Sequence, residues 1–355
     1  MNEHKMRFIV VGMGNLSNVM LNVLTALPWY GKTTAVVDIR QEALAKAKDR
    51  LGLTDDVLFT DFHAAITQRD ADVALINTGA EWHYTLVKAA LKSGLHVLVA
   101  KPLANTYEQA VELVELAAMQ GVTLCVGAQM RYNRHYTALQ KFVTSGMLGQ
   151  VEMVNFLNAK PQFDPLYLQG KPQPMLYDRS LLHFDALNAI FPQHIPEWIM
   201  CDGFQPSWSV FDGPCSINAL IRFHPRLHIF YQGGISSQSD LYEVRLEGAK
   251  GVLRCRGIHM SNDLMRYDFS ERGGTFAEHA IDSGMEIINP WMPFLEDWHN
   301  YLSNYSVADH TEPSFTGRNH LKVFAIASAC VDSFDSGQPI EIAANPKYCS
   351  AFDND

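Results

Sequence analysis

Short apolar runs alternate with helical patterns over the first third of the chain. Each run is apolar at successive positions, which is typical of strands buried on both faces of a parallel sheet. The segments between the runs repeat apolar residues at helical spacing and end near glycine, as at Gly94 and Gly121. The pattern predicts a doubly wound α/β domain over residues 1–128. The predicted strands are 8–11, 35–37, 57–59, 73–76, 97–99 and 123–126.

The pattern changes from residue 151 onward. Strand-like segments separated by glycine-containing turns now follow one another, among them 216–223, 228–232, 242–247 and 252–256. This succession predicts an α+β domain over residues 129–355 with an open, mostly antiparallel sheet. An open sheet with an apolar face needs a cover, so we expect a homo-oligomer, either a dimer or a tetramer.

A glycine-rich turn joins the first apolar run to the first helical pattern. Gly12 permits a tight turn out of the strand, and Gly14 lets the backbone approach a pyrophosphate closely. The helix that starts at Asn15 and Leu16 would present backbone N–H groups and a partial positive charge to that pyrophosphate. The third glycine of the usual fingerprint is Ser17 here, which is still small enough for close packing. The order of strand, turn and helix predicts a Rossmann dinucleotide-binding unit.

An acidic residue closes this predicted unit. Asp38 follows the second apolar run, where its carboxylate would accept hydrogen bonds from the adenosine ribose hydroxyls. The same charge would repel a 2′-phosphate, so the sequence predicts NAD as the cofactor in preference to NADP. Arg40 lies two residues further on, where it would either stack on the adenine or approach a 2′-phosphate.

Polar residues also follow the later strands of the predicted parallel sheet. The carboxyl ends of such strands meet at one edge, where ligands bind. Thr78, Gly79 and Gln129 lie at this edge, and so does Lys101, which follows a buried strand and precedes Pro102. We expect Lys101 to point into the cofactor cleft near the nicotinamide. The alternative is an edge lysine that reaches into solvent.

Composition excludes several other classes of protein. The net charge is -10 with no run of Lys or Arg, so we expect no nucleic acid partner. The six cysteines form no CxxC pair and the histidines show no HxH or HExxH spacing, which predicts reduced thiols and no metal. No signal peptide precedes Phe8, and no apolar run approaches the length of a membrane span. We therefore expect a cytoplasmic protein with no membrane partner.

Most of the chain, and residues 76–151 most specifically, resembles the Gfo/Idh/MocA oxidoreductase family, which includes relatives of glucose-fructose oxidoreductase and inositol dehydrogenase. The similarity rests on the helix from His83, the Lys-Pro pair at Lys101, Arg131 with Tyr132, and the segment 145–149. It implies an NAD-dependent dehydrogenase acting on a secondary hydroxyl of a sugar, glycoside or cyclic polyol. It also implies that His83 lies near the cofactor and Lys101 beside the nicotinamide and the reacting hydroxyl.

The chain departs from that family at two positions. Where the family usually has a Glu before Lys-Pro, this chain has Ala100, and where it has a catalytic His, this chain has Leu182. Asp178 matches the acid that orients that His. His183 lies one residue beyond the expected position, and one residue rotates a side chain by about 100° around a helix.

Three interpretations of the chemistry follow. In the first, Lys101 relays the hydroxyl proton with help from Asp178 or Tyr177. In the second, His183 is the base. In the third, the protein binds a dinucleotide but has lost dehydrogenase chemistry. His183 also has a purely structural alternative, as a helix histidine packed at the domain interface. Some relatives use tightly held NAD to cleave glycosides by oxidation and elimination, which is the nearest enzymatic alternative. The predicted substrate contacts are Lys101, Arg131, Tyr132, Lys160, Asp178 and His183.

Overall fold

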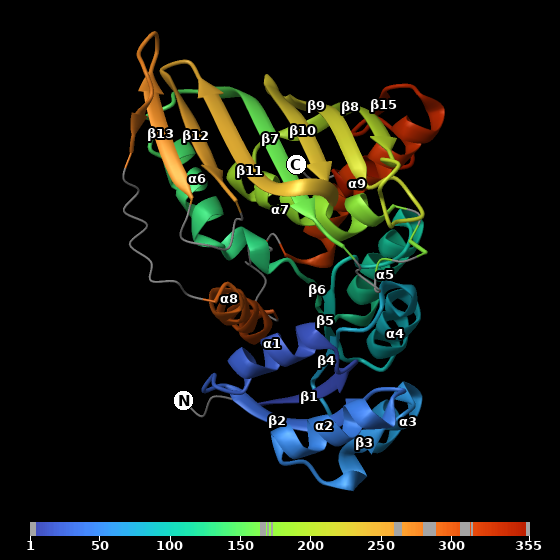
Figure 1. Cartoon of the computed structure of the whole chain (residues 1–355). Coiled ribbons are helices and arrows are strands. Elements are labelled where there is room, and N and C mark those ends of the chain that lie inside the picture. Colours follow the sequence, from blue (N-terminus) through green and yellow to red (C-terminus); the bar gives the residue numbers. More distant parts are fainter. Residues whose placement is uncertain are drawn as a thin grey trace. The chain divides into compact units, whose positions relative to one another are not determined.

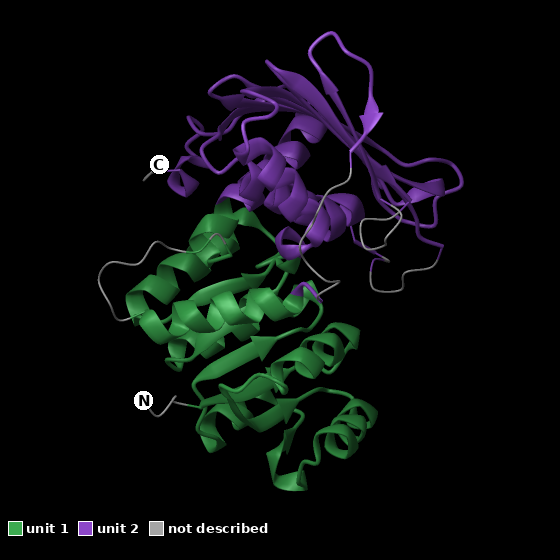
Figure 2. Cartoon of the chain, turned by 90° about the vertical axis from the view of Figure 1, so that its left-hand side faces the viewer, with its two compact units in different colours: residues 1–129, 291–321 green, residues 130–290, 322–355 purple. Residues whose placement is uncertain are grey.

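The chain forms two compact units in a computed structural model that describes residues 5–163, 168, 170–171, 173–258, 265–279, 289–305, 313 and 315–352. Unit 1 comprises Met1–Gln129 and Trp291–Leu321, and unit 2 comprises Met130–Pro290 and Lys322–Asp355 (Figure 2). Among the described residues, no helix is long and apolar enough to cross a membrane.

Unit 1 is built on a six-stranded sheet in the order β3-β2-β1-β4-β5-β6, and every pair of neighbouring strands is parallel. Helices cover both faces of this sheet (Figure 1), which confirms the predicted doubly wound fold. The strands are β1 (Met6–Val11), β2 (Tyr30–Val37), β3 (Leu58–Phe59), β4 (Val73–Ile76), β5 (His96–Ala100) and β6 (Leu124–Gly127). The helices are α1 (Asn15–Leu24), α2 (Gln41–Leu51), α3 (Phe62–Gln68), α4 (Ala80–Lys92) and α5 (Tyr107–Gln120).

Local side-chain chemistry sets several helix boundaries in unit 1. The Asp61 carboxylate accepts a hydrogen bond from the Ala64 backbone N–H at 2.7 Å and caps the start of α3. Thr106 caps α5 in the same way through Gln109 N–H at 3.2 Å. At the other end of α5, Gly121 has a φ of +65°, the left-handed conformation that ends many helices.

A late segment of the chain returns to unit 1. Helix α8 (Trp291–Asn304) packs against α1, and the Trp298 side chain is fully buried. Its ring centroid lies 6.4 Å from that of Phe8 and 6.2 Å from that of Trp29. The break after Gln129 lies one residue from the predicted domain boundary. The sequence placed 291–321 in the second domain, whereas the structure assigns this segment to unit 1, where Trp298 of α8 packs on Phe8 and Trp29.

Unit 2 contains a nine-stranded sheet in the order β14-β13-β12-β11-β7-β10-β9-β8-β15. Only the pair β7–β10 is parallel among its described neighbours, which confirms the mostly antiparallel prediction. The strands are β7 (Val151–Pro161), β8 (Ile195–Phe204), β9 (Ser216–His224), β10 (Leu227–Gly234), β11 (Ser236–Gly248), β12 (Gly251–Gly257), β13 (Arg266–Glu271), β14 (Ala277–Glu278) and β15 (Ile340–Glu341). The helices are α6 (Arg134–Thr144) and α7 (Leu181–Ile190), and α9 (Gly317–Ser336) starts in unit 1 and continues into unit 2.

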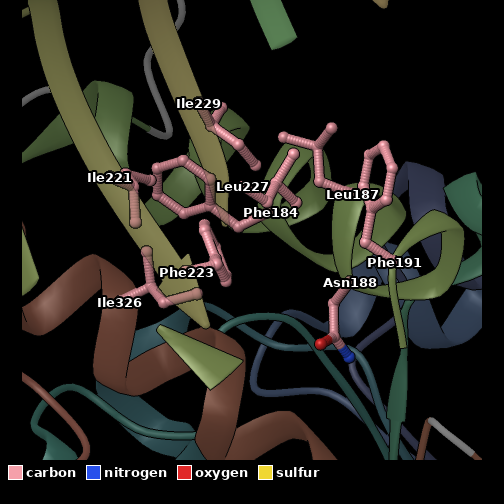
Figure 3. A pocket seen from close by; sticks show the side chains of 9 residues that line it. All are labelled: Phe184, Leu187, Asn188, Phe191, Ile221, Phe223, Leu227, Ile229 and Ile326. Atoms are coloured by element: carbon pink, nitrogen blue, oxygen red, sulfur yellow. The ribbon is translucent and has the colours of Figure 1, made fainter. Parts of the chain in front are cut away.

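One face of this sheet is covered by helices (Figure 1), and buried and more exposed side chains alternate along its strands. Figure 3 shows the layer between α7 and the sheet, where a gap of about 10 Å³ has one polar side chain, Asn188, in its lining. Because that volume is close to the minimum for one water molecule, the gap is a packing feature of the core and no ligand site. The lining residues are Phe184, Leu187, Asn188, Phe191, Ile221, Phe223, Leu227, Ile229 and Ile326.

The aromatic cluster that holds α8 can be tested by truncation. We expect Trp298→Ala to lower the free energy of unfolding by about 3–5 kcal/mol, because it removes a fully buried ring. Urea denaturation followed by circular dichroism measures the change. The control is Met119→Ala, at a side chain that is 80% exposed, with an expected change under about 0.5 kcal/mol. A change at Trp298 as small as the control's would contradict the packing of α8 on unit 1.

Candidate functional site

The turn after β1 passes very close to the end of β4. Gly12 has a φ of +85°, and a Cβ atom at this position would lie 2.7 Å from the Asn77 carbonyl oxygen. The Gly12 N–H donates a hydrogen bond to the Val37 carbonyl at 2.7 Å, which ties the turn to the end of β2. Both the conformation and the close approach exclude a side chain at Gly12, as the sequence predicts.

The second glycine leaves open space in front of α1. A Cβ at Gly14 would meet no atom within 4 Å, and α1 begins with the exposed residues Asn15 and Leu16. Ser17 is fully buried and its hydroxyl donates a hydrogen bond to the Gly12 carbonyl, so it fastens the helix to the turn as well as allowing close packing. An open cradle at a helix N-terminus fits a dinucleotide pyrophosphate.

Asp38 stands directly after β2 and is 7% exposed. Its Oδ2 accepts hydrogen bonds from the Met13 backbone N–H at 2.8 Å and Arg40 Nη2 at 3.0 Å. Its Oδ1 accepts from the Arg40 backbone N–H at 2.9 Å and Arg40 Nε at 3.1 Å. Burial raises the pKa of Asp38, but these hydrogen bonds from Arg40 and Met13 outweigh burial and hold the pKa below its ordinary value. Asp38 is therefore an ionised acceptor at neutral pH.

A groove of about 380 Å³ runs between the glycine turn with α1 on one side and α2 on the other. Arg40, Lys46 and Arg50 supply three cations to its lining, and Glu42 supplies one carboxylate. Arg50 spans the groove, because its Nη2 donates to the Asn18 carbonyl on α1 at 2.7 Å. The remaining lining residues are Met13, Gly14, Asn15, Asn18, Ala43 and Ala47.

The ends of β4 and β5 are joined by a buried histidine. His83 on α4 is 1% exposed, with Nδ1 2.6 Å from the Pro102 carbonyl oxygen and Nε2 3.1 Å from the Thr78 carbonyl oxygen. Burial lowers the pKa of His83 below its ordinary value and outweighs the contacts with the Pro102 and Thr78 carbonyls, which raise it. His83 lies beneath the two loops that carry Thr78, Gly79 and Lys101, and it supports their positions.

Lys101 occupies the position that the sequence predicts, immediately after the buried strand β5. Lys101 is half-buried. The following Pro102 is buried, and its carbonyl oxygen is in hydrogen-bond contact with His83 Nδ1. β1, β4, β5 and β6 are parallel neighbours, so Lys101 lies at the same sheet edge as the glycine turn, Thr78 and Gly79. Gln129 follows β6 at that edge and begins the 3₁₀ turn η2 (Gln129–Tyr132).

Two basic residues predicted to contact substrate have acidic partners within unit 2. Arg131 is 7% exposed and donates from Nε to Asp185 Oδ2 at 2.9 Å and from Nη2 to Oδ1. Lys160 lies on β7, and its Nζ donates to Asp240 Oδ1 at 3.0 Å. Both pairs join segments distant in sequence, so they fix the fold of unit 2. Tyr132 is half-buried in η2.

Asp178 lies on a π-helical turn, η4 (Leu176–Ser180), directly before α7. The carboxylate is 9% exposed, and Arg179 Nε lies 3.2 Å from its Oδ2. A π-helical turn holds more residues than an α-helical turn and often marks a functional position. A π-helical turn therefore changes the rotation between Asp178 and His183 from that of a regular α-helix. Such a change is the kind of local shift that would compensate for the one-residue displacement of His183 from the expected position.

His183 is 3% exposed and belongs to a directed chain of hydrogen bonds in unit 2. The Ser180 hydroxyl donates to the Met175 carbonyl at 3.3 Å, and the Tyr231 hydroxyl donates to Ser180 at 2.9 Å. Tyr231 must then accept from His183 Nδ1, which lies 2.9 Å away, so the ring carries its proton on Nδ1. This arrangement favours a packing role for His183 inside unit 2 over the role of general base.

The structure thus assembles one edge of unit 1 from the predicted cofactor residues. Lys46 and Asn18 also line the groove there, and neither was among the predicted site residues. A signal for Lys46 was available, because Lys46 and Arg50 are four residues apart and share one face of a helix.

Comparisons with known proteins agree with this geometry. Residues 6–128 match the family described as "Oxidoreductase family, NAD-binding Rossmann fold". The chain is 25% identical over 361 residues to an inositol 2-dehydrogenase/D-chiro-inositol 3-dehydrogenase of Halalkalibacterium halodurans, covering 97% of this chain and 96% of that protein.

Solved structures share the fold over most of the chain. An aldose-aldose oxidoreductase from Caulobacter crescentus superposes with a TM-score of 0.81 at 18% identity, covering 95% of this chain and 100% of that one. The WlbA dehydrogenase from Bordetella pertussis, in complex with NADH and UDP-GlcNAcA, gives 0.78 at 20% identity, covering 96% and 100%.

The two glycines of the turn make a matched pair of variants. We expect Gly12→Ala to lower the free energy of unfolding by more than about 1 kcal/mol, because its Cβ meets Asn77 and its φ is positive. Gly14→Ala should change stability by less than about 0.5 kcal/mol, yet weaken NAD binding by about tenfold or more, because its methyl enters the cradle. Thermal unfolding and calorimetric titration with NAD measure the two effects. Unchanged NAD affinity in Gly14→Ala would contradict this location for the pyrophosphate.

Proposed function

Because this chain belongs to the Gfo/Idh/MocA oxidoreductase family, we propose that it is an NAD-dependent dehydrogenase acting on a secondary hydroxyl of a sugar, glycoside or cyclic polyol. The full-length similarity to an inositol dehydrogenase supports this substrate class. The single observation that carries the proposal is Lys101, placed directly after β5 at the edge that holds the glycine turn.

Lys101 has the main role in the proposed reaction. Bound NAD would supply the hydride acceptor. The Lys101 side chain would hold the hydroxyl oxygen of the substrate and stabilise negative charge on that oxygen as its proton leaves. His83 fixes the Lys101–Pro102 loop through the Pro102 carbonyl, which limits the movement of Lys101.

Lys101 is proposed to relay the hydroxyl proton: it passes on one of its own protons as it takes up that of the substrate, with help from Asp178 or Tyr177. The burial of His183 and its bond to Tyr231 favour this choice over the alternative in which His183 is the base. Asp178 would orient the substrate or the proton relay, and Gln129, Arg131, Tyr132 and Lys160 stay proposed contacts or supports.

A second candidate function is binding of a dinucleotide or a sugar without turnover. Ala100 and Leu182, at positions where the family usually has Glu and His, favour it. The buried position of His183 favours it too, since no other residue of α7 is a histidine. Glycoside cleavage through transient oxidation is the third outcome that an activity screen would distinguish.

We also propose a homo-oligomer formed through unit 2. Met200, Leu220 and Phe230 lie opposite one another on three neighbouring strands, and Met200 and Phe230 are 38% and 42% exposed. An apolar row of this kind on an open sheet is typical of a subunit contact. The six cysteines are all thiols, which supports the proposed cytoplasmic location.

The activity is tested by NADH formation from NAD with a panel of inositols, hexoses and glycosides. We expect one substrate class to support NADH formation, and Lys101→Ala to lower that rate by about 100-fold or more. NAD affinity, measured by calorimetry, should stay unchanged in the variant.

Lys101→Arg is the matched control, since it keeps the charge but moves the donor atoms, and we expect an intermediate rate. Equal rates for wild type and Lys101→Ala would contradict the proposed role. Aglycone release without net NADH would instead identify the glycosidase reaction, and NAD binding without either product would identify the binding function.

The proposed subunit contact is tested by a charge on its apolar row. We expect the wild type to sediment as a dimer or tetramer and Phe230→Asp to sediment as a smaller species, because burying a lone carboxylate is costly. Met119→Asp, at an exposed site on unit 1, is the control and should not change the mass. A monomeric wild type would rule the oligomer out.

A further inference from the structure

The end of β8 and the loop that follows it expose three large apolar side chains. Phe204, Trp208 and Val210 are 51%, 59% and 52% exposed. Single exposed apolar residues are common on protein surfaces, but several in one short segment are typical of a binding surface. Trp208 provides the largest of the three side chains, and its indole combines an apolar face with one polar N–H.

Hydrogen bonds hold the indole of Trp208 and the loop around it in one arrangement. Trp208 Nε1 donates to the Ser236 carbonyl at 2.7 Å. The Ser209 hydroxyl oxygen accepts from the Ser236 hydroxyl at 3.0 Å and from the Phe211 backbone N–H at 3.1 Å. The ring is therefore ordered before any ligand binds, which lowers the entropic cost of binding.

The surroundings of Trp208 favour a neutral ligand that is rich in hydroxyl groups. The single indole donor is already used, so a ligand meets the apolar face of the ring. Residues 201–215 contain no Lys or Arg, which disfavours a phosphate or an anionic membrane. They contain Gln205 and Asp212, both exposed, whose side-chain oxygens accept hydrogen bonds from hydroxyls. A sugar ring suits both features, because its C–H groups form an apolar face and its hydroxyls lie at the edge.

Strand directions place Trp208 and the segment that leads to Asp178 at the same end of the unit 2 sheet. β10 is parallel to β7, and β9 is antiparallel to both β8 and β10, so β7, β8 and β10 run in one direction. The segments after β7 and after β8 therefore leave the sheet at one end. Trp208 lies in the segment after β8, and η4 with Asp178 follows the segment after β7.

Contacts inside unit 2 connect the anchor of Trp208 to Asp178. Ser236, which holds the indole, pairs with the last residue of β7. Gln162 follows that residue, and its amide oxygen accepts a hydrogen bond from Arg179 Nη2 at 2.7 Å. Arg179 Nε lies 3.2 Å from Asp178 Oδ2. Two side chains thus connect the Trp208 anchor to the acid that is proposed to orient the substrate.

We propose that Trp208 is a substrate-positioning residue that determines specificity: its ring stacks on the second sugar ring of a glycoside whose first ring is oxidised. The inference rests on the proposed function and narrows its substrate class to carbohydrates larger than one ring. The connection to Asp178 passes through Gln162 and Arg179, so Trp208 suits a ring linked to the one that Asp178 orients. Stacking on a ring that does not react contributes equally before and during hydride transfer, so it strengthens substrate binding and leaves the chemical step unchanged.

The kinetic test compares disaccharides with their parent monosaccharides in the assay for NADH formation. The probes are cellobiose, lactose and maltose against glucose and galactose. For the disaccharide that the wild type oxidises best, we expect Trp208→Ala to raise KM by about tenfold and to leave kcat unchanged. The KM for the parent monosaccharide should change by less than about twofold, because that substrate has no second ring.

Two further variants control for the ring and for the loss of a tryptophan. Trp208→Phe keeps an aromatic face but loses the N–H that binds Ser236, so it should raise KM less than Trp208→Ala does. Trp82→Phe changes a tryptophan of similar exposure, 56%, on α4 of unit 1, and should leave both substrates unaffected. Circular dichroism checks that each variant is folded. Sedimentation of Trp208→Ala should give the wild-type mass, which separates the stacking role from a subunit contact.

Binding is measured without turnover by titrating the tryptophan fluorescence with the same sugars at saturating NAD. We expect a disaccharide to change the emission of the wild type and of Trp82→Phe, because the ring of Trp208 is covered when the sugar binds. The change should be much smaller in Trp208→Phe, which lacks the reporting indole.

The outcomes distinguish this inference from the proposed function. Oxidation of monosaccharides or inositols without binding of any disaccharide would overturn the role of Trp208 and leave the dehydrogenase standing. An unchanged KM for the disaccharide in Trp208→Ala, an equal rise for both sizes of substrate, a fall in kcat alone or a smaller mass would also overturn it. Disaccharide binding that depends on Trp208 but yields no NADH would retain the stacking contact and overturn the dehydrogenase function. Neither binding nor oxidation of any sugar would overturn both.

Discussion

The close approach of Gly12 to Asn77 is the constraint on which the arrangement of the sheet edge at the carboxyl ends of the strands depends. We call this edge, which carries the predicted cofactor residues, the ligand edge. A side chain at Gly12 would push β1 and β4 apart at their carboxyl ends. With no side chain there, the turn lies flat between β2 and β4, and the next residue directs its N–H to Asp38. Ser17 then ties α1 back to the turn. Because Gly12 allows this close approach, the N-terminus of α1, Asp38 and the ends of the later strands lie at one edge of the sheet.

In unit 2, His183 is displaced from its expected position and is packed in the interior. His183 is shifted by one position from the place where relatives are expected to carry a catalytic histidine, and a π-helical turn precedes it. The ring is hydrogen-bonded to Tyr231 and lies near Phe156, with ring centroids 4.8 Å apart. A polar ring is stable in such an interior because its hydrogen bond is satisfied. Histidine thus has a structural position here, which supports the proposed role of Lys101 in the chemistry.

Residues that the sequence assigns to ligand binding can instead form ion pairs that stabilise the fold. Arg131 and Lys160 carry the charges that a polar substrate needs, yet their partners Asp185 and Asp240 lie 54 and 80 residues further along the chain. No local spacing reveals such pairs, because they depend on which strands and helices become neighbours. Asp38 and Arg40 differ, since they are two residues apart and their proximity was visible in the sequence.

The sequence by itself determined the parallel sheet of unit 1, the glycine turn, Asp38 and the position of Lys101 at the ligand edge. These features depend on local periodicity, on small residues at a turn and on the rule that parallel strands end at one edge. Only the tertiary structure decided that α8 returns to unit 1, that His183 and Arg131 are buried, and that three cations line one groove beside Asp38. Those outcomes arise from packing and charge pairing between segments far apart in the chain, which a single sequence does not encode in any local pattern.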